Sequence, residues 1–538
     1  MKKKYITIAL LATMCLSIAA GCSQPAEQTV TDTSNTASQS NAQTDTSKND
    51  KSKPDEKSTE PSKNEISEVS ETEISQPETE PEKYTIDNIR NYVVGVNEPV
   101  ELSDGTTRPL INFDNAATTP VLKPVQQAVD KEFEMYGSIG RGFSQKSNHS
   151  TELYNSVRDK VLNFVGADDN YTCFYVNNTT DGLNKLASAL VESEDDIVLS
   201  TRIEHHANDL SWRERCKTIY AEVDENGRVI YDDIEKMLKE NDVKYVAITA
   251  ASNVTGYVTD VHRVAKLAHQ YGAKIIVDGA QIVAHRKFSM IGDTPEENID
   301  FLVFSAHKMY SPYGGGAVIG LKDVLNEHMP EFYGGGIVTL VKDDEQYYKD
   351  APSRYEAGSP NYPGVVGLGK AIDILQEIGF DAIEEHEKRL NRKLIDGLKQ
   401  LDDIVIYGDT ENIDDRVGVV TFNFDHTTSY ILATNLSELG GVATRRGAFC
   451  AHPYVWRMMN LTQEEIDSFA NCTDMNTAGM IRISFGIYNT EEEVDEFLAM
   501  MPQMIQESDA VKFAREKVGI TDEKAIQDYI QERVKIKY

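Results

Sequence analysis

Short apolar runs rich in β-branched and aromatic residues alternate with longer segments of helical periodicity from Tyr84 onward. The predicted strands are Cys173–Val176, Ile197–Ser200, Tyr245–Ala250, Lys274–Asp278 and Phe301–Ser305. The predicted helices between them are Asp181–Ser193, Tyr231–Glu240 and Val261–Gly272. Parallel strands need crossover connections, and the helices that make them cover both faces of the sheet. The alternation therefore predicts an α/β fold with a mostly parallel sheet.

The pattern loosens after about residue 372, where long charged helices and a few strands follow. The predicted strands there are Val417–Phe424 and Ile481–Phe485. This change predicts a second, smaller subdomain of α+β type. The last thirty or so residues, from Asp509, are expected to form two helices broken near Gly519.

The N-terminus has the composition of a secretory signal. Three lysines precede an apolar run from Tyr5 to Ala20, and small residues lead into Cys22. A helix of that length is about 24 Å long, too short for a hydrocarbon core of about 30 Å. The run Ile18–Cys22 resembles a bacterial lipobox, which implies a signal peptide over residues 1–21 and a lipid on Cys22. A plain cleaved signal is the alternative.

Residues 22–83 are expected to form a disordered acidic linker, because Ser23–Lys83 contains no aromatic residue and cannot bury enough apolar surface to order itself. The folded part is then expected to be an exported, membrane-anchored lipoprotein facing outside the cytoplasm. The formal net charge of −33 argues against a nucleic-acid partner. We assign no metal site.

Polar side chains gather where three predicted strands end, which is where ligands bind in open α/β sheets. A helix start follows Val176, an acid ends the strand at Asp278, and an amine follows Ser305. Hydroxyls at a helix start suit a phosphate, a buried acid can hold a pyridinium N–H, and a pocket lysine can form a Schiff base. Singly each has a structural explanation, but together they indicate one cofactor. The residues concerned are Thr179, Thr180, Asp278, Gln281, Ser305, His307 and Lys308.

Several motifs in family order resemble class V pyridoxal-phosphate (PLP) enzymes over about residues 108 to 500. They are Phe113–Pro120, Glu204–Asn208, Ser252–Gly256, Ser305–Lys308 and Arg354–Asn361. The segment Arg445–Pro453 is similar to the cysteine motif of group II cysteine desulfurases and selenocysteine lyases. The resemblance implies PLP-dependent fold type I with a seven-stranded sheet. It places the PLP domain at 84–505, with a large subdomain over 135–375, a small one from 84–134 and 376–505, and a C-terminal extension over 506–538.

The resemblance also implies the roles of individual residues. Lys308 would hold PLP covalently, Asp278 would pair with the pyridine nitrogen, Gln281 would meet the ring hydroxyl and His205 would stack on the ring. Thr179, Thr180, Ser305 and His307 would bind the phosphate, and Arg482, Asn253 and Arg445 the substrate. Homodimerisation is implied as well.

The implied reaction is desulfuration of L-cysteine to alanine, with a persulfide on Cys450 and an unidentified sulfur acceptor. The thiol must ionise to act as a nucleophile, and Arg445 or Arg446 could favour this. The alternative for Cys450 is a small buried hydrophobe. Cys173, Cys216 and Cys472 are expected to serve packing or to form an oxidised pair.

Departures from the family pattern keep other functions open. Ala448 and Phe449 stand where group II enzymes usually have two histidines, two more are missing from Ile139–Ser144, and Tyr313 replaces a threonine. One alternative is another class V reaction on an amino acid, such as selenocysteine cleavage, transamination or epimerisation. The other is a surface lipoprotein that binds without catalysis.

Overall fold

The computed structural model describes residues 83–424, 429–469, 479–514, 519–522 and 524–526. The chain divides after Glu82 into two units. All of the described residues belong to the second unit. Cys22, in the first unit, and Cys472, between residues 469 and 479, lie outside the described residues. No helix in the described part of the chain combines the length and the apolar character that a bilayer span needs.

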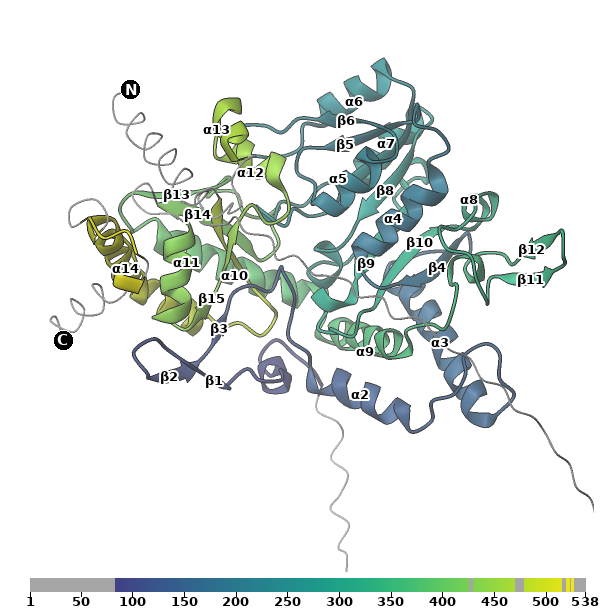
Figure 1. Cartoon of the computed structure of the whole chain (residues 1–538), viewed down its shortest axis with the longest axis horizontal. Coiled ribbons are helices and arrows are strands. Elements are labelled where there is room, and N and C mark those ends of the chain that lie inside the picture. Colours follow the sequence, from purple (N-terminus) through teal and green to yellow (C-terminus); the bar gives the residue numbers. More distant parts are fainter. Residues whose placement is uncertain (1–82, 425–428, 470–478, 515–518, 523, 527–538) are drawn as a thin grey trace, which may run out of the picture. The chain divides into compact units, whose positions relative to one another are not determined.

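A seven-stranded sheet forms the centre of the larger subdomain (Figure 1). Only β10 runs against its neighbours, so the predicted mostly parallel sheet is confirmed. In spatial order the strands are β4 (Tyr171–Val176), β10 (Gly316–Leu321), β9 (Phe301–Ser305), β8 (Lys274–Asp278), β7 (Val243–Thr249), β5 (Ile197–Thr201) and β6 (Lys217–Ala221).

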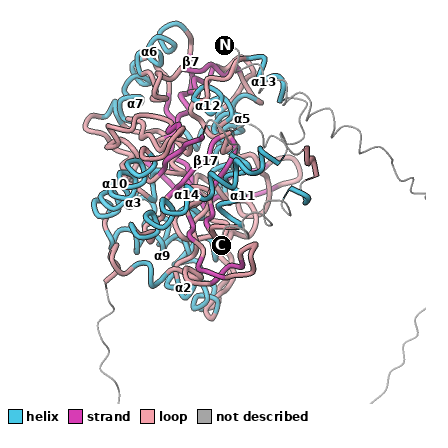
Figure 2. Tube along the Cα trace, turned by 90° about the vertical axis from the view of Figure 1, so that its left-hand side faces the viewer, coloured by secondary structure: helices cyan, strands magenta, loops and turns pink. Residues whose placement is uncertain are grey.

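Helices cover both faces of this sheet, and Figure 2 shows the strands running between them. Alternate residues of one strand enter different cores: Leu302 and Phe304 face one, Phe301 and Val303 the other. Both faces are buried, which is why the strands read as continuous apolar runs. The helices of this subdomain are α2 (Lys123–Phe133), α3 (Gln145–Phe164), α4 (Thr179–Leu190), α5 (His206–Arg213), α6 (Tyr231–Glu240), α7 (Val261–Gln270), α8 (Lys322–Glu327) and α9 (Tyr362–Ile378).

The elements that we predicted in this subdomain agree closely with those observed, whereas β6, β10, α2, α3, α5, α8 and α9 were not predicted. β8, β9 and α6 have the predicted bounds. Helix α4 begins two residues earlier than expected because Asn178 caps it, accepting a hydrogen bond from the amide of Asp181. Helix α7 ends at Gln270, and Gly272 follows with a φ of 83°, the conformation that favours glycine after a helix.

The smaller subdomain contains an antiparallel four-stranded sheet, in the order β13 (Ile404–Ile406), β14 (Val419–Phe424), β17 (Met480–Ser484) and β16 (Arg445–Gly447). A short parallel pair joins β3 (Ile111–Asn112) to β15 (Val442–Ala443). The helices are α10 (Phe380–Leu398), α11 (Ser429–Glu438), α12 (His452–Met458), α13 (Gln463–Ser468) and α14 (Glu491–Phe513).

Two hairpins and several single helical turns complete the described elements. The hairpins are β1 (Pro99–Glu101) with β2 (Thr107–Pro109), and β11 (Val338–Val341) with β12 (Gln346–Tyr348). The 3₁₀ turns are η1 (Ile89–Tyr92), η2 (Ile282–Ala284), η3 (Pro295–Glu297), η4 (Ala306–Lys308) and η5 (Ser353–Tyr355).

The N-terminal segment, which we assigned as a whole to the smaller subdomain, is shared between two cores. Ile89 and Leu122 are buried in the larger core, whereas Ile111 and Phe113 are buried with the smaller one. At the other end, α14 continues to Phe513, past residue 506 where we placed the start of the C-terminal extension, and Met504 is buried in the smaller core. The boundaries of the subdomains depend on which side chains are buried together, and the spacing of residues in the sequence does not show this.

Candidate active site

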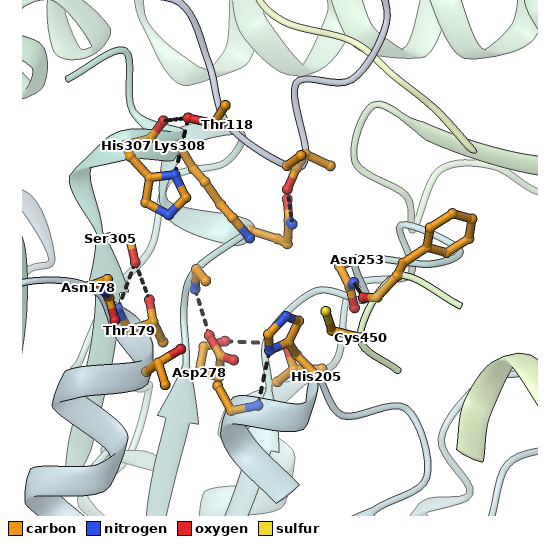
Figure 3. Close-up of a pocket in the computed structure, with 18 of the residues that line it drawn as sticks. Thr118, Asn178, Thr179, His205, Asn253, Asp278, Ser305, His307, Lys308 and Cys450 are labelled. Atoms are coloured by element: carbon orange, nitrogen blue, oxygen red, sulfur yellow. Dashed lines mark hydrogen bonds between the residues drawn. The ribbon is translucent and has the colours of Figure 1, made fainter. Parts of the chain in front are cut away.

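A cavity of about 590 Å³ lies at the carboxyl ends of β4, β8 and β9 (Figure 3). The start of α4, the residue before α5, the middle of β17, the first residue of β16 and the loop between β16 and α12 contribute further to its wall. Every residue to which we assigned a catalytic, cofactor-binding or substrate-binding role lines it. These residues are Thr179, Thr180, His205, Asn253, Asp278, Gln281, Ser305, His307, Lys308, Arg445, Cys450 and Arg482.

Hydroxyl and amide groups converge at the start of α4. The backbone amide of Thr179 donates to Ser305 Oγ at 2.7 Å, and the two hydroxyl oxygens of these residues lie 2.6 Å apart. The first turn of a helix also carries unpaired N–H groups and the positive end of the helix dipole. This corner of the cavity can therefore bind a phosphate.

His307 lies on the turn η4, opposite that helix start. Its Nδ1 is 3.2 Å from Thr118 Oγ1, and its carbonyl oxygen accepts from the amide of Thr119 at 3.0 Å. Burial, with the nearby charge of Lys308, lowers the pKa of His307 to about 4. The ring is therefore neutral near pH 7 and offers one N–H as a donor.

Lys308 and Asp278 bring an amine and a carboxyl group to the same cavity. Burial lowers the pKa of Lys308 to about 8, although Asp278 acts in the opposite direction. Burial also raises the pKa of Asp278, against the amide of Ala280, which donates to Asp278 Oδ1 at 2.9 Å. An amine with a lowered pKa has a larger neutral fraction near pH 7, as a nucleophile for a carbonyl group requires.

His205 immediately precedes α5 and caps its first turn. Its Nδ1 accepts from the amide of Ala207 at 3.0 Å, so the neutral ring carries its proton on Nε2. Burial and the charge of Lys308 lower the pKa of His205 to about 3. An uncharged, rigidly held ring results, suitable for stacking on another aromatic ring.

Glu204 has a buried carboxyl group to which sequence reasoning assigned no role. It accepts from Thr201 Oγ1 at 2.5 Å and from Asn208 Nδ2 at 2.7 Å. Burial raises the pKa of Glu204 to about 8, despite these hydrogen bonds. Its place directly before His205 in a motif was a signal, but burial is not visible in the sequence.

Gln281 presents an unsatisfied acceptor. Its Nε2 donates to the carbonyl oxygen of Ala116 at 3.0 Å, whereas its buried Oε1 has no hydrogen-bond partner in the described part of the chain. Leaving a buried polar atom unpaired is costly, so this oxygen is available for a ligand donor.

Two arginines face the cavity from neighbouring strands of the smaller sheet. Arg482 on β17 donates from Nη1 to the carbonyl oxygen of Asn253 at 2.9 Å and from Nη2 to Asp114 Oδ1 at 3.0 Å. Its buried Nε has no hydrogen-bond partner among the described residues. Arg445 on β16 is half exposed and lies 3.7 Å from Asp114 Oδ2. The free donors on Arg482 suit a carboxylate.

Cys450 is exposed, so it is not the buried packing residue of the alternative interpretation. Phe449 and Cys450 have φ angles of 50° and 56°, an uncommon left-handed conformation for side chains of this size. Two contacts hold their carbonyl oxygens: Asn253 Nδ2 donates to Phe449 at 2.6 Å, and the amide of His206 donates to Cys450 at 2.7 Å. The conformation of this loop thus places the Cys450 side chain at the cavity (Figure 3).

The predictions for Arg446 and for the other cysteines have different outcomes. Arg445 lines the cavity, whereas the guanidinium of Arg446 lies 4.3 Å from the centre of the Tyr430 ring. Of the two arginines expected near the thiol, only the first lines the site. Cys173 is buried in β4 and Cys216 is half buried, and both are free thiols.

The cavity residues fit pyridoxal phosphate. A phosphate-binding corner, a buried carboxyl group for a pyridine nitrogen, an amine of lowered pKa and an unpaired acceptor at Gln281 are the groups that this cofactor requires.

Comparisons with known proteins agree with this site. The family model for aminotransferase class-V matches residues 111–497. The chain is 32% identical over 397 residues to a probable cysteine desulfurase of Halalkalibacterium halodurans, covering 72% of this chain and 91% of that protein. It is 34% identical over 431 residues to a cysteine desulfurase of Haloferax volcanii, covering 78% of this chain and 93% of that protein.

Solved structures show the same fold. The apo structure of a cysteine desulfurase from Thermococcus onnurineus has a TM-score of 0.68 and 29% identity, covering 78% of this chain and 98% of that one. The cysteine desulfurase CsdA of Escherichia coli has a TM-score of 0.65 and 25% identity, covering 79% and 99%. The chain therefore belongs to the aminotransferase class-V family, whose members depend on pyridoxal phosphate.

Proposed function

We propose that this protein is a cysteine desulfurase that converts L-cysteine to alanine and transfers the sulfur atom to Cys450. The observation that carries the proposal is one cavity lined by a buried amine, a carboxylate-binding arginine and an exposed thiol. The relatives named above are cysteine desulfurases, which supports the same reaction.

The cofactor-binding side of the cavity comes from the larger sheet. We assign the phosphate to Thr179, Thr180, Ser305 and His307, and the pyridine nitrogen to Asp278. His205 would stack on the ring, Gln281 Oε1 would accept from the ring hydroxyl, and Lys308 would provide the covalent attachment. When bound, PLP supplies a conjugated system that accepts the electron pair released at the substrate Cα.

The substrate-binding side comes from both subdomains. Arg482 binds the carboxylate through donors that the protein leaves free, while Asn253 and Arg445 line the same part of the cavity. Lys308 would be the group that moves a proton at the substrate Cα, for which a pKa near 8 is suitable.

Sulfur transfer then takes place at Cys450. The Cys450 thiolate attacks the substrate sulfur, an S–S bond forms, and the substrate C–S bond breaks with its electron pair left on carbon. Protonation of that carbon gives alanine, and Cys450 is left as a persulfide. The carbon is reduced and the sulfur pair oxidised, so the step needs no external oxidant.

The test is an assay of the PLP-loaded chain with L-cysteine and a thiol reductant, in which alanine and sulfide are measured together. Equal amounts of both support the proposal. We expect Cys450→Ala to keep the cofactor absorbance and to lose sulfide release, while Cys216→Ala, a second free thiol outside the cavity, behaves as wild type. Sulfide release at the normal rate from Cys450→Ala would contradict the mechanism. A cofactor spectrum without either product would indicate another class V reaction.

We further propose that the enzyme is exported and held at a membrane by a lipid on Cys22, from the signal-like sequence before that residue. Mass analysis of the mature N-terminus tests this, because an unmodified chain that starts elsewhere would contradict it. A homodimer is proposed from the family resemblance, and light scattering of the purified enzyme tests it.

A further inference from the structure

Arg445 and Arg482 lie directly opposite each other in the smaller sheet. The antiparallel register of β16 and β17 pairs these two residues, so their side chains leave the same face of the sheet. Like charges directly opposite each other in a sheet repel. A negatively charged group is therefore needed to offset the repulsion between these two guanidinium groups.

Asp114 is that group. It accepts from Arg482 Nη2 at 3.0 Å through Oδ1, and its Oδ2 is 3.7 Å from Arg445 Nη1. One carboxylate thus contacts both guanidinium groups, one with each oxygen. Its side chain is 21% exposed, between that of Arg482 at 3% and that of Arg445 at 52%.

The backbone fixes Asp114 in this place. The amide of Ser484, two residues after Arg482, donates to the carbonyl oxygen of Phe113 at 2.7 Å, and Asp114 forms a parallel bridge with Ser484. The amide of Asp114 also donates to Asn112 Oδ1 at 3.1 Å. These contacts hold the backbone of Asp114 beside β17, so its carboxylate stays within reach of both arginines.

We propose that Asp114 is a positioning residue that sets substrate charge specificity. It neutralises one of the two positive charges, so the pair retains a net charge of +1 and accommodates one carboxylate. Arg482, buried, takes the α-carboxylate, and Arg445, bound to Asp114, is withheld from a second anionic group. The pocket thereby favours amino acids with uncharged side chains over those with acidic ones. The inference rests on the proposed role of Arg482 in binding the substrate.

The test compares the affinities of the PLP-loaded full-length enzyme for two amino acids without a thiol, L-alanine and L-aspartate. The affinities are measured by titration calorimetry at low ionic strength. Low salt matters because Arg445 is half exposed and its charge is screened. We expect the wild type to bind L-alanine more tightly. In Asp114→Asn this preference should fall about tenfold, as expected for one added charge-assisted contact. Asp114→Glu, which keeps the charge, should retain most of it.

A double variant identifies the arginine responsible. In Asp114→Asn with Arg445→Gln the preference for L-alanine should return, because the released charge is gone. An unchanged preference in folded Asp114→Asn would overturn the inference, and so would a wild type that binds both ligands equally. If Asp114→Asn does not fold, Arg445→Gln alone should raise the preference severalfold and Arg445→Lys should not. An unaltered preference in Arg445→Gln would again overturn it.

Sulfide and alanine release from L-cysteine, measured on the same preparations, separates the two proposals. A wild type that binds both ligands with the expected preference but releases neither product contradicts the desulfurase proposal alone. A wild type that binds neither ligand overturns the charge-specificity inference, and it overturns the desulfurase proposal as well if neither product is released.

Discussion

The two sides of the cavity are built in different ways. The side formed by the larger sheet consists of buried strand ends and helix starts, joined by contacts within that sheet and its helices, such as Thr179 with Ser305. The side formed by the smaller subdomain is a loop with two successive left-handed residues, Phe449 and Cys450, held by Asn253 and His206 from the larger subdomain. The first arrangement is set by its own strands, and the second depends on contact between subdomains. Cofactor binding and sulfur transfer should therefore respond to different substitutions.

The largest effect is expected from Lys308→Ala. This change removes the covalent attachment and the proton-moving group together, so turnover should fall on the order of 10⁴-fold and the absorbance band of the covalently attached cofactor should disappear. The measurement is a spectrum of the reconstituted variant with a sulfide assay. Lys322→Ala, an exposed lysine outside the cavity, is the matched control and should leave both unchanged.

Asn253→Ala tests the side of the cavity formed by the Phe449–Cys450 loop. It removes the 2.6 Å hydrogen bond to the Phe449 carbonyl, so the strained loop should relax and sulfide release should drop about 10- to 100-fold. The cofactor spectrum should not change. Because Asn253 also lines the substrate site, the rate of Cys450 alkylation without substrate is the decisive measurement. An alkylation rate equal to wild type would show that this contact does not hold the loop.

Ser305→Ala tests the side of the cavity formed by the larger sheet. Loss of the hydroxyl leaves the Thr179 amide without its 2.7 Å partner and removes one donor at the phosphate corner. We expect the dissociation constant for PLP to rise about tenfold, with the Cys450 alkylation rate unaffected. Equilibrium dialysis measures the first and mass spectrometry the second. A change in Cys450 reactivity would mean that the two sides are coupled.

The smallest effect on activity is expected at Glu204, directly before His205, because its titration acts on stability. Its pKa is raised to about 8 by burial, whereas an unfolded glutamate titrates near 4.5. Between these values the folded state binds a proton that the unfolded state does not, so this contribution to stability is complete below about pH 4.5 and is lost as the pH rises toward 8. The contribution falls by up to about 1.4 kcal/mol per pH unit.

Glu204→Gln keeps the shape of the side chain without its titration. The unfolding free energy of the variant minus that of the wild type should therefore increase from pH 5 to pH 8, measured by denaturant unfolding. A difference in unfolding free energy that does not vary with pH would show that the titration of Glu204 does not contribute to stability.

Much of the larger sheet could be predicted because both of its faces are buried. Continuous apolar runs with polar residues at their ends placed β8 and β9 with correct bounds, and the same ends named Asp278, Ser305 and Lys308. Asp114 and Glu204 lie inside motifs that the sequence analysis quoted, yet their roles could not be predicted. Their chemistry depends on burial and on partners distant in the sequence.

The sequence alone determined the α/β class, the order of the elements that it predicted, the cofactor class and twelve of the residues that line the cavity. These follow from local composition and from motifs, which carry their own spacing. Only the tertiary structure decided that Cys450 is exposed in a left-handed loop and that one carboxylate at Asp114 spans two arginines. These features arise where segments far apart in the chain meet. The distances and burial that control charge and strain there are properties of the packed fold.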